Sequence, residues 1–248
     1  FRNDITVSEE RIKKVAEAYR GIRNAFRYQL SNLYDFDPAQ HTIADDELTG
    51  LDRCVLAAFA KLESDVRTAC DECEFHTAYQ RITQFVSVEL SAVYHDTVKD
   101  RLYTSPANST RRRSTQTAIY RLVQGFAKML SPMIVFTADE AWEAIPHLDS
   151  SSVHLTDWEP FEFSISAEES ANWETMFAIR ERTLPMLEEA RQAKQIGKSL
   201  EACVTLTGNG REIEIGQAHG EDLRELINVS ELKLEAGGGG ELQVAVAH

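Results

Sequence analysis

The sequence is poor in the residues from which several common classes of protein are built. Its 248 residues include only 12 glycines, 6 prolines and 4 cysteines. Cysteines this few and this irregularly spaced fit reduced thiols better than a disulfide framework. No apolar run approaches the roughly 18 residues that suggest a membrane-spanning helix, and the first residues do not resemble a signal peptide. We therefore expect a cytoplasmic protein without a membrane partner.

Signatures of an independent enzyme are missing as well. Neither a glycine-rich phosphate loop nor a Gly-x-Ser-x-Gly turn occurs, so we predict no catalytic residues. The one spacing typical of a metal site is Cys70-x-x-Cys73, and Cys54 and Cys203 supply no second pair at zinc-ribbon distance. His76 can add only a third ligand. Because free cysteines pack readily in cores, we interpret the pair as two buried thiols and expect no bound metal.

Basic residues are also scarce, and the formal net charge is −14. Such a charge argues against nucleic-acid binding, which depends on lysine and arginine. The distribution of charge matters more than the total, however. Residues 99–128 hold seven basic residues and one acidic residue, whereas residues 138–189 hold thirteen acidic and two basic residues. One stretch can therefore face a polyanion while another keeps the protein in solution.

Apolar residues recur at steps of three and four, which places them on one face of a helix. Four long segments show this pattern: residues 8–33, 48–69, 75–94 and 109–130. Ser8 is a suitable N-cap for the first, and Thr137 with Glu140 forms a capping-box pattern that begins a shorter helix. A last long helix is predicted over about 168–195, kinked or divided at Pro185. The apolar faces are narrow, so the helices should pack as a bundle.

After Gly197 the pattern changes to short alternating segments typical of strands. The predicted strands are 202–207, 212–215, 231–234 and 242–246. A small helix fits between Gly220 and Leu226, residues 208–210 (Gly-Asn-Gly) are a hairpin signal, and residues 237–240 form a turn or linker. We predict a mainly α fold, with a helical domain over residues 1–197 and a small α+β domain over residues 198–248.

Five polar residues of the first predicted helix fall within one arc beside its apolar face, at about 100° per residue. They are Lys13, Arg20, Arg23, Asn24 and Arg27. Lys13, Arg20 and Arg27 are spaced by seven and so lie nearly in line. Such a row can follow an RNA backbone, because a guanidinium offers paired donors to phosphate. An ordinary solvated helix face, paired with acids elsewhere, explains the spacing equally well.

A second group of candidate RNA-binding residues lies in the basic stretch. Three adjacent arginines follow two basic residues across a short predicted loop, and at most two of the three can share a helix face. Tyr103, Asn108 and Ser109 can stack on unpaired bases or hydrogen bond to them. The predicted contacts in this group are Lys99, Arg101, Tyr103, Arg111, Arg112 and Arg113.

Several runs of the sequence resemble, in order, those of bacterial isoleucyl-tRNA synthetases. Residues 19–28 (Tyr-Arg-Gly-Ile-Arg-Asn-Ala-Phe-Arg-Tyr) and 33–38 (Leu-Tyr-Asp-Phe-Asp-Pro) are similar to the opening of that family's anticodon-binding domain. Residues 136–142 (Phe-Thr-Ala-Asp-Glu-Ala-Trp) continue the similarity. Residues 196–202 (Ile-Gly-Lys-Ser-Leu-Glu-Ala) resemble the entry to its C-terminal junction domain. This last run favours the isoleucyl branch over the valyl and leucyl branches, which share the bundle.

The resemblance implies a helical bundle of the class I synthetase anticodon-binding type, which docks the anticodon stem-loop of isoleucine tRNA. In this family a catalytic domain joins isoleucine to its tRNA with ATP and Mg²⁺, and an inserted domain edits valine. Neither the HIGH nor the KMSKS signature of the catalytic domain occurs here, and the chain begins with Phe1 instead of Met. We therefore expect a fragment cut from a longer protein, without the catalytic and editing domains of that chain.

The expected fragment is inactive alone, holds no cofactor and is a monomer. It also ends before the position of a C-terminal zinc ribbon that family members often carry. Three alternatives stay open at this stage. The chain can be an anticodon-binding domain of the valyl or leucyl type, a helical protein-interaction module that uses its acidic segment, or a self-contained enzyme.

Overall fold

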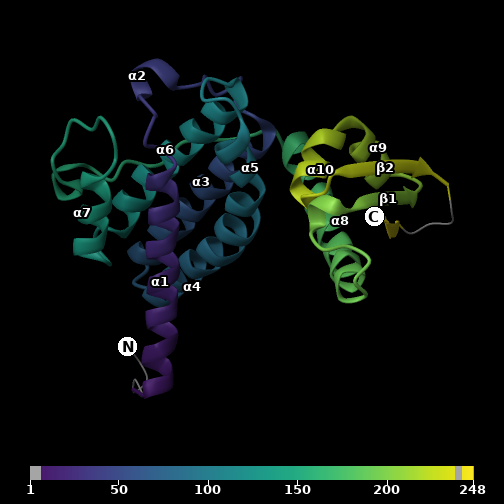
Figure 1. The fold of residues 1–248 in the computed structure, drawn as a ribbon. Coiled ribbons are helices and arrows are strands. Elements are labelled where there is room, and N and C mark those ends of the chain that lie inside the picture. Colours follow the sequence, from purple (N-terminus) through teal and green to yellow (C-terminus); the bar gives the residue numbers. More distant parts are fainter. Residues whose placement is uncertain (1–6, 238–241, 248) are drawn as a thin grey trace. The chain divides into compact units, whose positions relative to one another are not determined.

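A computed structural model describes residues 7–237 and 242–247 of the chain. The contacts within it form two compact units, residues 1–164 and residues 165–248. Figure 1 shows helices alone in the first unit, and a small sheet with covering helices in the second. The predicted fold class, a mainly α protein with a helical bundle followed by a small α+β domain, is confirmed. Within the described residues, no helix is long and apolar enough to cross a membrane.

The first unit is a bundle built around two long helices that pack against each other, α3 (Gly50–Asp71) and α6 (Thr110–Leu130). At their contact the rings of Phe59 and Phe126 lie 4.8 Å apart, and both are buried. Around this pair lie α1 (Glu9–Ser31), α2 (Pro38–His41), α4 (Phe75–Gln84), the π-helix η1 (Phe85–His95), α5 (Asp96–Thr104), α7 (Val135–Glu143) and the short η2 (Val153–Leu155). The segment predicted as one helix over 75–94 is thus α4 continued by η1.

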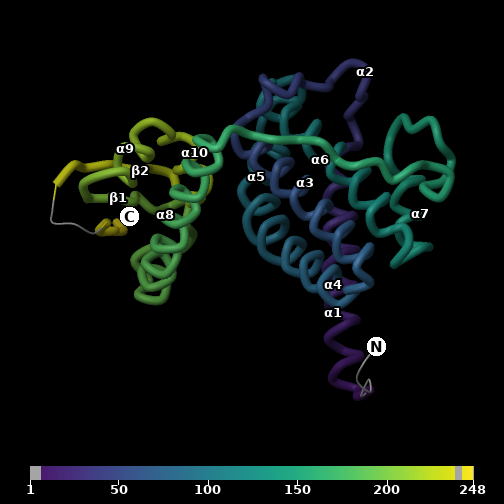
Figure 2. Tube along the Cα trace, turned by 180° about the vertical axis from the view of Figure 1, so that it is seen from behind, coloured from purple at the N-terminus to yellow at the C-terminus, as the bar shows by residue number. Residues whose placement is uncertain are grey.

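Helix α1 is packed along only half of its length. From Glu9 to Arg20 nearly every residue is exposed, whereas Ile22, Ala25 and Phe26 are buried. Ser8 caps the helix as predicted, accepting a hydrogen bond from the backbone N–H of Arg11. In Figures 1 and 2 the N-terminal half of α1 extends beyond the helices beside it. The N-terminal half of this helix therefore presents most of its circumference to solvent.

The predicted capping box of Thr137 and Glu140 is wrong. Helix α7 begins at Val135, two residues before Thr137, and it has no side-chain cap. Both side chains instead contact α1. The Thr137 hydroxyl hydrogen bonds to that of Tyr19 at 2.8 Å, and Glu140 pairs with Arg23. The two side chains that the local pattern assigned to the helix end thus make tertiary contacts instead.

The second unit contains the long helix α8 (Ala167–Gln192), the short η3 (Ser199–Glu201) and a three-stranded sheet. Its strands are β1 (Cys203–Gly208), β2 (Glu231–Ala236) and β3 (Gln243–Ala247), in the order β2-β1-β3. Strand β1 is parallel to β2 and antiparallel to β3. Helices α9 (Arg211–Ala218) and α10 (Gly220–Ile227) form the connection between the two parallel strands.

Several predictions for this unit differ from the structure. The strand at 212–215 and the hairpin before it are wrong, because parallel strands require a crossover, and here helix α9 begins it. Helix α8 runs through Pro185 without dividing and packs against α9, α10 and β3. The contacts therefore group α8 with the sheet, whereas we expected the domain boundary at residue 197. Of the predicted turn at 237–240, residues 238–240 lie outside the described residues.

Candidate nucleic-acid interface

The predicted basic arc of α1 is exposed along its whole length. Its members are Lys13, Arg20, Arg23, Asn24 and Arg27. Lys13 pairs with Glu9 one turn away, and Arg23 Nη1 lies 2.9 Å from Glu140 Oε2 of α7. Among the described residues, the side chains of Arg20 and Arg27 have neither an ion-pair nor a hydrogen-bond partner. Two arginines of one helix face thus keep all their donors available to a ligand.

A groove of about 540 Å³ lies beside this arc, between α1 and α7. Asn24, Arg27 and Ser31 line it from α1, and Thr137 and Glu140 line it from α7. The Tyr19–Thr137 hydrogen bond and the Arg23–Glu140 ion pair join the two helices. Exposed ion pairs of this kind contribute little to stability. Arg23 can therefore exchange Glu140 for a phosphate at small cost.

Three predicted contact residues are buried, and this placement corrects the prediction. Arg101, Arg112 and Arg113 expose only 3%, 3% and 6% of their surface. Arg101 Nη1 lies 3.5 Å from the fully buried carboxylate of Asp52. That carboxylate also accepts hydrogen bonds from Tyr94 and Ser114. Buried guanidinium groups are retained where carboxylates pair with them, so these three arginines belong to the framework of the bundle and have no surface for RNA.

Arg112 and Arg113 are held by Asp35, which follows the end of α1. Arg112 donates two parallel hydrogen bonds to the Asp35 carboxylate, at 2.7 and 2.8 Å, and Gln116 donates a third at 2.8 Å. Arg113 Nη1 donates to the Asp35 carbonyl at 2.9 Å. The hydrogen bonds from Arg112 lower the pKa of Asp35 to about 2. Two guanidinium groups face one carboxylate here, so the cluster carries one net positive charge.

The rest of the second group lies nearer the surface. Lys99 pairs with Asp96 at 2.8 Å, and Arg111 is half-buried. Tyr103 is 65% exposed. A residue that the sequence analysis missed, Tyr34, is 81% exposed, and the Arg112 guanidinium carbon lies 5.9 Å from its ring centre. A tyrosine in the loop after a helix does not reveal in the sequence whether its ring is covered.

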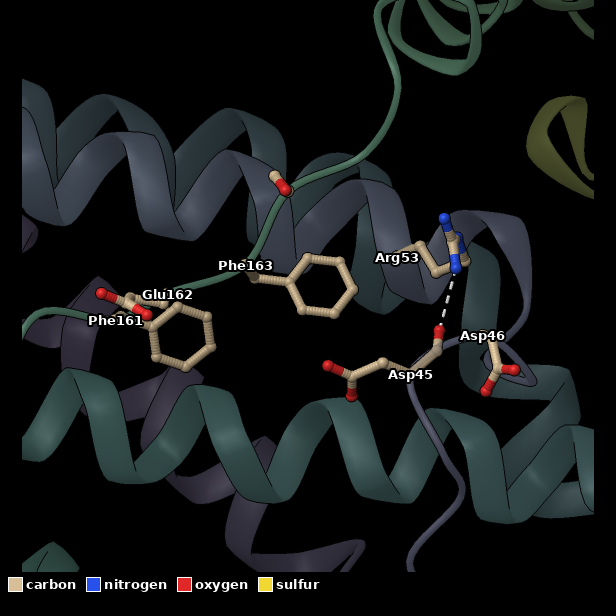
Figure 3. A pocket seen from close by; sticks show the side chains of 7 residues that line it. Asp45, Asp46, Arg53, Phe161, Glu162 and Phe163 are labelled. Atoms are coloured by element: carbon tan, nitrogen blue, oxygen red, sulfur yellow. Dashed lines mark hydrogen bonds between the residues drawn. The ribbon is translucent and has the colours of Figure 1, made fainter.

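A second groove of about 610 Å³ has the opposite electrostatic character. Figure 3 shows Asp45, Asp46 and Glu162 around it together with the rings of Phe161 and Phe163. Arg53 donates a hydrogen bond to the Asp45 carbonyl at 2.9 Å, drawn as the dashed line. Arg121 pairs with the Asp45 carboxylate at 2.6 Å and lies over the rings of Phe161 and Phe163. Three carboxylates against two guanidinium groups leave a net negative charge, which repels a polyanion. This groove is therefore not a candidate for RNA binding, in contrast to the arc on α1.

We predicted that the cysteine pair is two buried thiols, and this prediction is wrong. Cys70 is half-buried and Cys73 is exposed. Cys73 has a φ of 58°, and the backbone N–H groups of Cys73 and Glu74 bond back to α3, an arrangement typical of a helix end. His76 is exposed beside Glu74, at 3.2 Å. Among the described residues, no group of three or more His, Cys, Asp and Glu side chains is placed to hold a metal ion.

Comparison with known proteins shows which family the sequence resembles. A family model described as the anticodon-binding domain of tRNA ligase matches residues 52–206. The isoleucine–tRNA ligase of Halalkalibacterium halodurans is 44% identical over 211 residues, which are 85% of this chain and 23% of the relative. That of Geobacillus thermodenitrificans is 42% identical over 234 residues, 93% of this chain and 25% of the relative. That of Legionella pneumophila strain Lens is 40% identical over 233 residues, with 94% and 25% coverage. The chain thus spans about a quarter of the length of these relatives.

Proposed function

The chain belongs to the family of anticodon-binding domains of tRNA ligases, and from this premise we propose that it binds tRNA through the exposed arc of α1. The observation that carries the proposal is the pair Arg20 and Arg27. Both are exposed and unpaired among the described residues, although the chain has carboxylates in excess and a net charge of −14. Guanidinium groups available on one helix face suit the phosphates of a polynucleotide.

The spacing of the arc supports contact with a polynucleotide backbone. Residues seven apart on a helix lie about 10 Å apart along its axis, so Lys13, Arg20 and Arg27 form a row that can reach several phosphates. Phosphate contacts fix the position and orientation of a nucleic acid without reading its bases. We therefore assign to α1 the docking of the tRNA and not the choice among tRNAs.

The names of the relatives suggest which tRNA is bound. Because they are isoleucine–tRNA ligases, we infer that the partner is the tRNA for isoleucine. In a longer protein of that kind, the bundle would hold the tRNA while its joining to isoleucine with ATP takes place in the remaining three-quarters of the chain. We further propose that it does so as a monomer in the cytoplasm.

The proposal is tested by charge reversal on α1. The variant Arg20→Glu, Arg27→Glu is titrated with a transcript of isoleucine tRNA and compared with Lys61→Glu, Arg191→Glu. Lys61 and Arg191 are exposed on other helices, and the two variants change the net charge equally. We expect the α1 variant to lose at least about tenfold in affinity, because each lost phosphate contact also forfeits counterion release, and the control to stay close to the parent chain. Equal weakening in both variants, or no affinity of the parent chain for the transcript, would overturn the proposal and favour a protein-interaction module.

A further inference from the structure

We propose that Tyr34 and Tyr103 form a stacking platform for unpaired bases, separate from the phosphate-binding arc of α1. The proposal rests on the RNA binding proposed above and adds a second kind of contact to it. Tyr34 follows the end of α1, and Tyr103 lies in the last turn of α5. Their exposed fractions are 81% and 65%. The fold does not use these two rings to fill its core.

A single buried side chain holds both tyrosine-bearing segments. The Arg112 guanidinium donates to the carboxylate of Asp35, next to Tyr34, at 2.7 and 2.8 Å. Its Nε donates to the carbonyl of Leu102, next to Tyr103, at 3.2 Å. Each tyrosine is therefore one residue from a group bound to the same guanidinium, although 69 positions separate Tyr34 from Tyr103 in the sequence. One buried arginine thus links the two segments that carry the exposed rings.

The backbone beneath the rings is fixed before any ligand arrives. Gln116, which is fully buried, donates to both the Asn32 carbonyl and the Asp35 carboxylate, each at 2.8 Å. Arg112 also donates to the Ala107 carbonyl at 3.2 Å, which ties down the loop after α5. A platform preorganised in this way loses less conformational entropy when a ligand binds. The buried arginines thus act on RNA indirectly, as positioning residues.

The chemistry of the site suits nucleobases attached to a polyanion. Aromatic rings accept the faces of bases of any identity. Two guanidinium groups against the single Asp35 carboxylate leave one positive charge in the cluster that holds the two segments, and half-buried Arg111 lies next in sequence. Asn108 is exposed and accepts a hydrogen bond from Arg113 through Oδ1 at 3.1 Å, which orients its amide group. Within the described residues that amide nitrogen has no partner and can donate to a base edge.

Another exposed aromatic residue provides a matched control. Phe136 of α7 is 90% exposed, but its exposed neighbours are the apolar Met133 and Val135. Phe136 therefore offers an exposed aromatic ring beside apolar neighbours, whereas Tyr34 and Tyr103 have arginines nearby. Tyr34→Ala with Tyr103→Ala tests the platform, Tyr34→Phe with Tyr103→Phe keeps the rings without their hydroxyls, and Phe136→Ala removes an aromatic ring elsewhere.

The experiment compares two RNA probes on the full chain: a hairpin with an unpaired loop that contains 2-aminopurine, and a blunt duplex of equal charge. The alanine pair should weaken hairpin binding by at least about tenfold, since each stacked base contributes substantially to affinity, and should leave duplex binding unchanged. The phenylalanine pair and Phe136→Ala should bind both probes as the parent chain does. The change in 2-aminopurine fluorescence on binding, which reports stacking, should persist in the phenylalanine pair and vanish in the alanine pair.

Two results would overturn the platform alone. The alanine pair can bind the hairpin as well as the parent chain does, or it can weaken hairpin and duplex equally. If either result occurs while charge reversal on α1 still weakens binding of both probes, the proposed tRNA-docking role of α1 is retained and the platform is refuted. If the parent chain binds neither probe, the proposed function fails, and the platform fails with it.

Discussion

The arginine side chains of the bundle lie in two different environments. Arg20 and Arg27 are exposed on α1, whereas Arg101 is buried against Asp52, a residue 49 positions earlier in the sequence. Both kinds occur in stretches where basic residues outnumber acidic ones. The acid that pairs with a buried arginine is distant in sequence and appears only in the structure.

This difference predicts that alanine destabilises the protein strongly at the buried site and hardly at all at the exposed site. Arg101→Ala leaves the buried carboxylate of Asp52 without its cation, which should lower the free energy of unfolding by about 3 to 5 kcal/mol. Arg20→Ala should change it by less than about 0.5 kcal/mol, as is usual for surface substitutions. Urea denaturation followed by circular dichroism measures both. Equal stability of the two variants would contradict the framework role of Arg101.

His95 predicts a pH dependence of stability. The residue is 7% exposed, and its ring stacks on that of Tyr28 with centroids 4.1 Å apart. Within the described residues its Nε2 has no hydrogen-bond partner. Burial lowers the pKa of His95 from 6.5 to about 3. The folded protein therefore keeps the ring neutral, while the unfolded chain takes up a proton below pH 6.5.

The stabilisation from a neutral His95 is complete above pH 6.5 and is lost as the pH falls towards 3. Over this window one proton of difference corresponds to about 1.4 kcal/mol per pH unit. The His95→Phe variant has no proton to take up at this position when it unfolds. Its free energy of unfolding should therefore fall less steeply on acidification than that of the parent chain. Denaturation curves at a series of pH values measure it, and parallel profiles for both proteins would refute the assignment.

At the scale of elements, the contact of α3 with α6 depends on a glycine. A Cβ at Gly125 of α6 would lie 2.8 Å from Cζ of Phe59 and even closer to its Cε1. Phe59 is fully buried and cannot easily move away. Gly125→Ala should therefore destabilise the bundle by about 1 to 3 kcal/mol, although alanine favours a helix over glycine by about 1 kcal/mol.

Gly21 of α1 supplies the matched control for this substitution. A Cβ there would meet only Val86 Cγ1, at 4.0 Å, which is ordinary contact. Gly21→Ala should stabilise the protein by about 0.5 to 1 kcal/mol, because it restricts the unfolded chain and fits the helix. Thermal denaturation of both variants tests the pair. A stabilised Gly125→Ala variant would show that α3 and α6 pack less closely than described.

The sequence predicted those elements whose cause is local. The periodicity of α1, α3 and α6 and the cap at Ser8 depend on neighbours a few residues away. Residues 212–215 alternate like a strand, yet they lie in α9, since β1 and β2 are parallel and need a crossover. Likewise Glu140 matched a capping box, and its partner is Arg23 of a distant helix. Non-local contacts decided each of these cases.

The predicted site residues likewise divide into those that depend on local geometry and those that depend on non-local contacts. The arc on α1 needed only helical geometry, and its residues are exposed as that geometry requires. The role of the Arg111–Arg113 run depended on Asp35, which folding brings to Arg112 from 77 positions away. Tyr34 was missed for the same reason, because its exposure depends on how the chain leaves α1.

At the scale of the whole molecule, both proposed RNA-binding surfaces lie in the first compact unit, residues 1–164. That unit contains the buried core of α3 and α6 and the Asp52 and Asp35 networks. We therefore predict that residues 1–164 alone unfold cooperatively and bind isoleucine tRNA within about threefold of the whole chain, a difference below 1 kcal/mol. Loss of tRNA affinity in a folded fragment would assign the main contact to the second unit.

The central claim is that α1 neutralises phosphates of a tRNA, and the salt dependence of binding measures this most directly. Affinity decreases with salt, and each neutralised phosphate adds about 0.7 to 0.9 to the magnitude of the slope of log affinity against log salt concentration. For Arg20→Ala with Arg27→Ala, the magnitude of this slope should therefore be smaller by about 1.4 to 1.8 than in the parent chain. The charge-matched Lys61→Ala with Arg191→Ala should keep the parent slope. Identical slopes in all three proteins would contradict the claim, because two exposed arginines that leave the slope unchanged contact no phosphate.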